Sequence, residues 1–179
     1  MNKGFTLIEL LVSVSVTAII VAVGGDIFLS VIRSYNKSNI TNEVEQNGSY
    51  ALTLMEREIR NASRIVSPVS SGTQSFITLE DPLNNRTEYF FAAGSGAGDT
   101  CLNGSVQKRL ADATEQVLTN TSRIEGINVT ALSFSVTRND PAPPSVTINL
   151  AINQGCGASS RIDYQSSINL TTTVSLRNY

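Results

Sequence analysis

The chain has 179 residues, a net charge of −2, two cysteines, and neither histidine nor tryptophan. This length is sufficient for one domain with a hydrophobic core and an additional segment. The near-neutral charge gives no indication of a nucleic-acid-binding surface. The lack of histidine removes the commonest general base and the commonest neutral metal ligand. We therefore expect no cofactor and no metal site.

The apolar residues are concentrated in residues 5–32, where only Glu9 and Asp26 carry charge. A bilayer core requires about 20 apolar residues in a helix, so this segment can span a membrane. The charged leader of residues 1–4 is short, the apolar run exceeds the usual signal-peptide core of about 7–15 residues, and no A-x-A-like cleavage site ends it. These features favour a retained membrane anchor over a removable secretory signal.

Glu9 is an unusual residue for such a segment, because an ionised carboxylate in hydrocarbon needs a partner or a route to water. Glu9 could lie near the interface and snorkel to water. Alternatively, it could pair with a cation at the same depth, which peptide cleavage after Gly4 would create as the α-ammonium of Phe5. Phe5 and Glu9 are one helical turn apart, about 6 Å along the axis. Staggered parallel helices could then pair the ammonium of one chain with the carboxylate of the next, which would fix their register.

The run KGFTLIELLV, with Gly4 before Phe5 and Glu9 four residues later, resembles the class III signal of type IV pilins and type II secretion pseudopilins. The resemblance implies that a prepilin peptidase cleaves between Gly4 and Phe5 on the cytoplasmic face and methylates the new amino group of Phe5. It also implies that Glu9 helps the subunit to join the filament. Many pilins have a proline near the middle of this helix, whereas here Gly24 and Gly25 are the only residues that disfavour it.

The same resemblance implies partners and a location. The partners are other pilins or pseudopilins in a helical filament, the prepilin peptidase and an inner-membrane assembly platform. Before assembly the protein would be a single-pass protein of the cytoplasmic membrane with its N-terminus inside. After assembly it would belong to a cell-surface or periplasmic filament.

Residues 33–66 are expected to form an amphipathic helix that continues into the head. The helix should end near Val66, because Pro68 follows. Glu56 and Arg60 have the spacing of a favourable i,i+4 pair on the solvated side. The run NGSYALTLMEREIRNASRI is similar to the same portion of J-type minor pseudopilins and W-type minor pilins. The apolar stripe of this helix recurs at spacings of three and four: Val44, Gly48, Ala51, Met55, Ile59 and Ala62.

Residues 67–179 are predicted to form a β-rich globular head. Period-2 alternation indicates an antiparallel sheet with one buried face and the helix packed on it, so the fold class is α+β. A phase slip at Ala131 and Leu132 indicates a β-bulge. The last strand, TTTVSLRN, is again similar to that of J- and W-type heads. The predicted strands are residues 76–79, 87–91, 107–110, 116–119, 127–138, 146–152 and 168–176, of which the third and fourth form a hairpin.

Cys101 and Cys156 belong to no CxxC pair, so neither a zinc site nor a thioredoxin-type motif is indicated. In a domain outside the cytoplasm they would form one disulfide; the alternative is two free buried thiols. A disulfide would close a loop of roughly 55 residues and stabilise the fold by about 4 kcal/mol. The basic residues around the span decide little about orientation, so the cysteine pair is the feature that favours a head outside the cytoplasm.

No arrangement of residues in the head indicates catalysis. The carboxylates are scattered, and no serine has a histidine to activate it. Asp99 in GSGAGD could contribute to a calcium site, but one carboxylate is far short of the usual 6–8 oxygen ligands. We therefore expect a structural protein, a minor pilin or pseudopilin, and not a membrane-tethered enzyme. The alternative is a binding module at a filament tip, whose ligand would be DNA, a surface or a secreted substrate.

Overall fold

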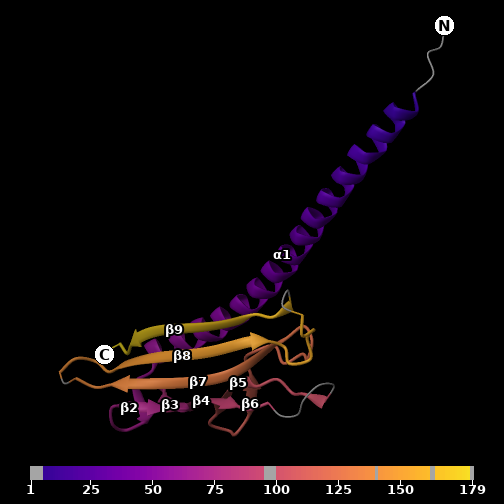
Figure 1. The fold of residues 1–179 in the computed structure, drawn as a ribbon. Coiled ribbons are helices and arrows are strands. Elements are labelled where there is room, and N and C mark those ends of the chain that lie inside the picture. Colours follow the sequence, from indigo (N-terminus) through magenta and orange to yellow (C-terminus); the bar gives the residue numbers. More distant parts are fainter. Residues whose placement is uncertain (1–5, 95–99, 140, 162–163, 178–179) are drawn as a thin grey trace.

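The structure, a computed structural model, describes residues 6–94, 100–139, 141–161 and 164–177. A single helix, α1 (Leu7–Asn61), contains 55 residues and extends about 82 Å at 1.5 Å per residue. Its first half projects away from the β-rich head, and its second half lies against the head (Figure 1). Gly24 and Gly25 do not interrupt it. The expected membrane-spanning and amphipathic helices are therefore one continuous element.

The second half of α1 packs on the head through the predicted apolar stripe. Its buried residues are Val44, Gly48, Ala51, Leu52, Met55 and Ile59. Gly48 allows the closest approach, because a Cβ atom there would lie 2.4 Å from Cδ1 of Ile152 and 2.6 Å from Cδ1 of Leu170. The helix backbone thus lies directly on the sheet at this point.

The prediction that the helix ends near Val66 is wrong by five residues. The helix ends at Asn61, and Ala62 adopts an extended conformation with φ −66° and ψ 142°. The next residues form strand β1 (Arg64–Ser67), which pairs with β3 (Phe76–Glu80). Pairing with a strand that lies later in the chain therefore ends the helix before the proline does.

Within the described residues, the head contains two antiparallel sheets rather than the single sheet expected from the alternation. The first has the order β1-β3-β4-β5-β6 and is completed by β4 (Arg86–Ala92), β5 (Ser105–Leu110) and β6 (Glu115–Val117). The second has the order β2-β7-β8-β9 and comprises β2 (Gly72–Gln74), β7 (Ile127–Thr137), β8 (Ser145–Gln154) and β9 (Ser167–Ser175). In Figure 1 the three long strands β7, β8 and β9 lie side by side.

All the predicted strands are present, and the expected hairpin is β5 with β6. The bulge is also confirmed, because the β7–β8 register shifts between Val129 and Ala131. Strand β2 was not predicted.

Helix α1 packs on β8 and β9, and β7 contacts β3, β4 and β5, so one core joins the helix and both sheets. The α+β architecture, a long N-terminal helix on antiparallel sheets, is confirmed. The largest core side chains include Met55, Ile59, Ile77, Tyr89, Phe134 and Ile148.

Candidate assembly site

The first half of α1 presents a long apolar surface that the head does not cover. The large apolar side chains from Leu7 to Val31 are 51–82% exposed. None of the most apolar part of the helix is buried against the head. An exposed apolar surface of this size marks contact with a membrane or with other proteins. The helix is long and apolar enough to cross a bilayer.

Three hydroxyl groups in this segment are satisfied within the helix itself. Ser13, Ser15 and Thr17 each donate a hydrogen bond of 2.8 Å to the carbonyl oxygen four residues earlier. In hydrocarbon a polar group without a partner is costly, so these internal bonds make the hydroxyls compatible with a bilayer. Placing these hydroxyl groups in a bilayer therefore costs little free energy. Glu9 is the side chain of the first turns for which this cost stays high.

Glu9 forms a capping box with Thr6, the residue that precedes the first helical turn. The Glu9 N–H donates to the Thr6 hydroxyl at 3.3 Å, and the Thr6 N–H donates to the Glu9 carboxylate at 3.5 Å. These bonds satisfy two of the backbone donors that every helix leaves free at its start. We did not predict this role, although the T-x-x-E spacing of Thr6 and Glu9 was its signal.

Gly4 and Phe5, the predicted cleavage and methylation residues, lie outside the described residues. The pairing of Glu9 with an ammonium group of Phe5 therefore stays a prediction. The geometry at Glu9 is compatible with it, since 3.5 Å is at the outer limit of a hydrogen bond and such a contact is released at low cost.

Polar contacts attach the second half of α1 to the head. The Asn36 amide donates to the Tyr164 hydroxyl at 3.2 Å. The Glu56 carboxylate accepts a hydrogen bond from the Thr172 hydroxyl on β9, so the expectation that Glu56 lies on the solvated side is wrong. Further along, Lys108 on β5 pairs with Glu58 at 2.6 Å. The span and the head are consequently joined by one helix that is fixed on both sheets.

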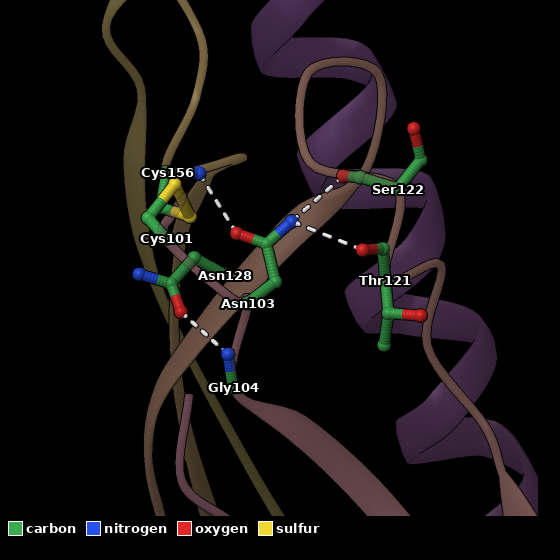
Figure 2. The surroundings of a disulfide bond; sticks show 7 residues. All are labelled: Cys101, Asn103, Gly104, Thr121, Ser122, Asn128 and Cys156. Atoms are coloured by element: carbon green, nitrogen blue, oxygen red, sulfur yellow. Dashed lines mark hydrogen bonds between the residues drawn. A yellow bond between two sulfur atoms is a disulfide. The ribbon is translucent and has the colours of Figure 1, made fainter. Parts of the chain in front are cut away.

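Cys101 and Cys156 form a disulfide with a Cα–Cα distance of 6.1 Å, so the alternative of two free thiols is excluded for this structure. Figure 2 shows that Asn103 lies beside it. The Asn103 side chain accepts from the Cys156 N–H at 2.7 Å and donates to the Ser122 carbonyl at 2.7 Å. The disulfide and this buried amide together tie three loops of the head.

The carboxylate of Glu80 is the most heavily paired acid of the first sheet. Its side chain is 8% exposed and accepts from Arg64 at 2.7 Å and from Arg86 at 3.3 Å. The hydrogen bond from Arg64 and the nearby Arg86 hold the pKa of the Glu80 carboxyl below its usual range. This cluster fastens β1 to β3 and β4, so its role is structural.

A cleft of about 770 Å³ lies between the C-terminal end of α1 and the first sheet. Leu54, Glu58 and Asn61 of the helix line it, and this end of α1 lies against the head, away from the projecting apolar half (Figure 1). The Lys108–Glu58 ion pair lies in its wall. The described residues contain no group of three His, Cys, Asp or Glu side chains placed to hold a metal ion. Asp99, the one calcium candidate, lies outside the described part of the chain. The charged residues that line the cleft are Arg57, Glu58, Asp81, Arg86, Lys108 and Asp112.

Comparison with known proteins identifies one family signature. The prokaryotic N-terminal methylation motif matches residues 1–25. No curated protein and no solved structure matches the chain. The matched motif belongs to structural, non-enzymatic proteins of the pilin type. Together with the exposed apolar helix, it supports membrane anchoring before assembly into a surface filament. The motif at residues 1–25 thus supports a precursor of the type IV pilin and pseudopilin superfamily.

Proposed function

We propose that this protein is a pilin or pseudopilin subunit that is cleaved between Gly4 and Phe5, methylated on Phe5, and assembled into a filament through α1. The observation that carries the proposal is the continuity of the methylation motif at residues 1–25 with an apolar helix that the head leaves bare. This apolar surface contacts lipid before assembly and the helices of other subunits afterwards.

Glu9 is the residue that makes assembly into the filament more favourable than remaining in the bilayer. In the isolated chain its carboxylate is used locally, in the capping box with Thr6. In the filament it pairs with the methylated ammonium of Phe5 from a neighbouring subunit, so two costly charges neutralise each other only on assembly. The long capping contact of 3.5 Å supports this exchange, because little is lost when the carboxylate turns to its new partner.

The finer assignment is a minor subunit of the J or W type, with the filament either a type IV pilus or a type II secretion pseudopilus. It is supported by the resemblance of residues 47–65 and of the last strand to those heads. Its partners would be other pilins, the prepilin peptidase and the inner-membrane assembly platform. Its head would lie outside the cytoplasm, where the Cys101–Cys156 disulfide is stable.

The test of assembly is fractionation of cells that make the full chain together with the assembly machinery. Filaments sheared from the cells should contain the protein at its processed size, and membranes should contain the remainder. Absence from filaments that otherwise assemble normally would contradict the proposal.

A tip-located binding module is the second candidate, and the 770 Å³ cleft favours it. The cleft lies at the end of α1 remote from the span, and this is the end that a filament tip would expose. The test compares the full chain with Lys108→Ala in filaments, by binding of the filaments to DNA, to surfaces and to secreted protein. Equal binding by both filaments would remove the cleft as a binding site.

A further inference from the structure

Asp26 is a second carboxylate within the apolar surface of α1. Apolar side chains flank it on both sides along the helix, among them Val23, Ile27 and Phe28, which are 56–65% exposed. Asp26 lies about 28 Å from the start of the helix at Leu7, near the far boundary of a hydrocarbon core about 30 Å thick. A carboxylate at such a depth requires a partner or water. Within the described residues Asp26 has no ion pair and no hydrogen-bonded side-chain partner.

Arg33 is the nearest cation that follows Asp26 on the helix. The two residues are seven positions apart, which places them on the same face but about 10.5 Å from each other along the axis. That separation is too long for an ion pair within one chain, and Arg33 has no such partner in the described part of the structure. The next cation, Lys37, donates to the carbonyl oxygen of Gln165 and is therefore engaged with the head.

A stagger between parallel helices brings these two charges together. If one copy is shifted toward the head until its Phe5 lies level with Glu9 of the next, the shift is four residues, or about 6 Å. The same shift brings Asp26 of the shifted copy level with Ser30 of the other, three residues or about 4.5 Å below Arg33. Arginine side chains on a helix lean toward its N-terminus. Arg33 therefore reaches down toward that carboxylate.

The pairing has a direction. With the same stagger, the reverse pair, Arg33 of the shifted copy and Asp26 of the other, is separated by eleven residues or about 16.5 Å. Only one of the two cross-pairs can form, so the contact is head-to-tail and leaves one Asp26 and one Arg33 for the next copies. A contact of this kind extends into an open helical array and does not close as a dimer.

We propose that Asp26 of one copy and Arg33 of the adjacent copy form a second inter-subunit ion pair, which fixes the helix stagger together with Glu9. The occupant of this helix face is a second copy of the chain, because the chain itself supplies both charges at the required offset. The inference rests on the proposed assembly into a filament, and it requires that two copies of the chain are neighbours there, as in a filament that contains many copies of it. It assigns Asp26 and Arg33 a role in the choice of neighbour and register.

The first experiment is a charge exchange in the full chain, measured as protein in sheared filaments relative to membranes. Asp26→Arg and Arg33→Asp should each lower incorporation roughly tenfold, the scale of one lost interhelical polar contact of about 1.4 kcal/mol. The variant with both substitutions should return to within about threefold of wild type. Glu45→Arg is the control, because Glu45 is an exposed acid of the same helix beyond the apolar span.

The second experiment is cysteine cross-linking between differently tagged copies in the same cells. A copy with Asp26→Cys should cross-link to a copy with Arg33→Cys. Two copies with Asp26→Cys should not cross-link to each other, since that bond requires unstaggered helices.

The outcomes separate the two proposals. If the wild-type chain is absent from filaments, both the proposed function and the ion pair fail. If wild type assembles and the single charge reversals assemble equally well, or the exchange does not restore assembly, the ion pair is wrong and the proposed function stands. A dominant cross-link between two Asp26→Cys copies would also overturn the ion pair.

Discussion

Three substitutions separate the two uses of Glu9, as a helix cap and as the partner of a neighbouring ammonium. Glu9→Gln keeps an acceptor for the Thr6 N–H but has no charge, because a glutamine serves in a capping box as a glutamate does. Thr6→Ala removes the cap and leaves the carboxylate in place. Glu9→Ala removes both functions. All three should insert into membranes as the wild type does, since the apolar span is unchanged.

The structure gives the two effects different magnitudes. The capping contacts of 3.3 and 3.5 Å are long, so Thr6→Ala should cost less than about 1 kcal/mol and reduce filament incorporation less than about fivefold. In Glu9→Gln the neighbouring ammonium stays unpaired within the filament core. An unpaired charge in hydrocarbon costs about 2.5–3.5 kcal/mol, so incorporation should fall roughly 60- to 300-fold.

The assay is the ratio of protein in sheared filaments to protein in membranes for each variant, by quantitative immunoblot. The expected order is wild type, then Thr6→Ala, with Glu9→Gln and Glu9→Ala far below. If Glu9→Gln assembled like wild type while Thr6→Ala did not, Glu9 would act as a cap, and the charge-pairing argument would be refuted.

Three further predictions concern the head and its packing. Cys156→Ser, which opens the bond to Cys101, should lower the free energy of unfolding of the full chain in detergent by about 4 kcal/mol; a change below about 1 kcal/mol in a urea titration would contradict this. Glu80 has a lowered pKa when folded, so its contribution to stability is present above its unfolded pKa of about 4.3 and is lost as the pH falls through the folded pKa. Thermal melts should show a smaller acid loss for Glu80→Gln than for wild type, and equal losses would exclude the cluster as a cause. Gly48→Leu should destabilise by about 1–3 kcal/mol through overpacking, whereas Gly24→Ala, with nothing within 4 Å of its Cβ, should not destabilise.

The sequence was informative wherever a local pattern determines the structure. The uninterrupted apolar run predicted the exposed span, and the spacing from Val44 to Ile59 predicted the face that α1 buries. The phase slip near Ala131 predicted the bulge, because one extra residue in a strand moves every later side chain to the opposite face.

The sequence was uninformative where distant segments decide. Residues 64–67 look like the last turn of a helix, but their backbone pairs with β3, whose position the local pattern does not encode. Strand β2 (Gly72–Gln74) has three exposed residues and therefore no alternation to detect. Alternation also reveals which face of a strand is buried but not which strands are neighbours, so the division into two sheets was missed.

The candidate assembly site shows the same division. Glu9 was predicted from its position in an apolar segment, whereas its contact with Thr6, which the T-x-x-E spacing indicates, was not predicted. The cleft near Lys108 and Glu58 could not be predicted, because its walls come from the end of the helix and from strands β3, β4 and β5, whose packing on the helix no local pattern encodes. The roles of Gly4 and Phe5 stay predictions.

The most direct test of the central claim is the mass of the N-terminal peptide of the protein isolated from filaments. The account predicts that this peptide begins at Phe5 and carries one methyl group on its amino nitrogen. A peptide that begins with an intact Met1, or with an unmethylated Phe5, would contradict it.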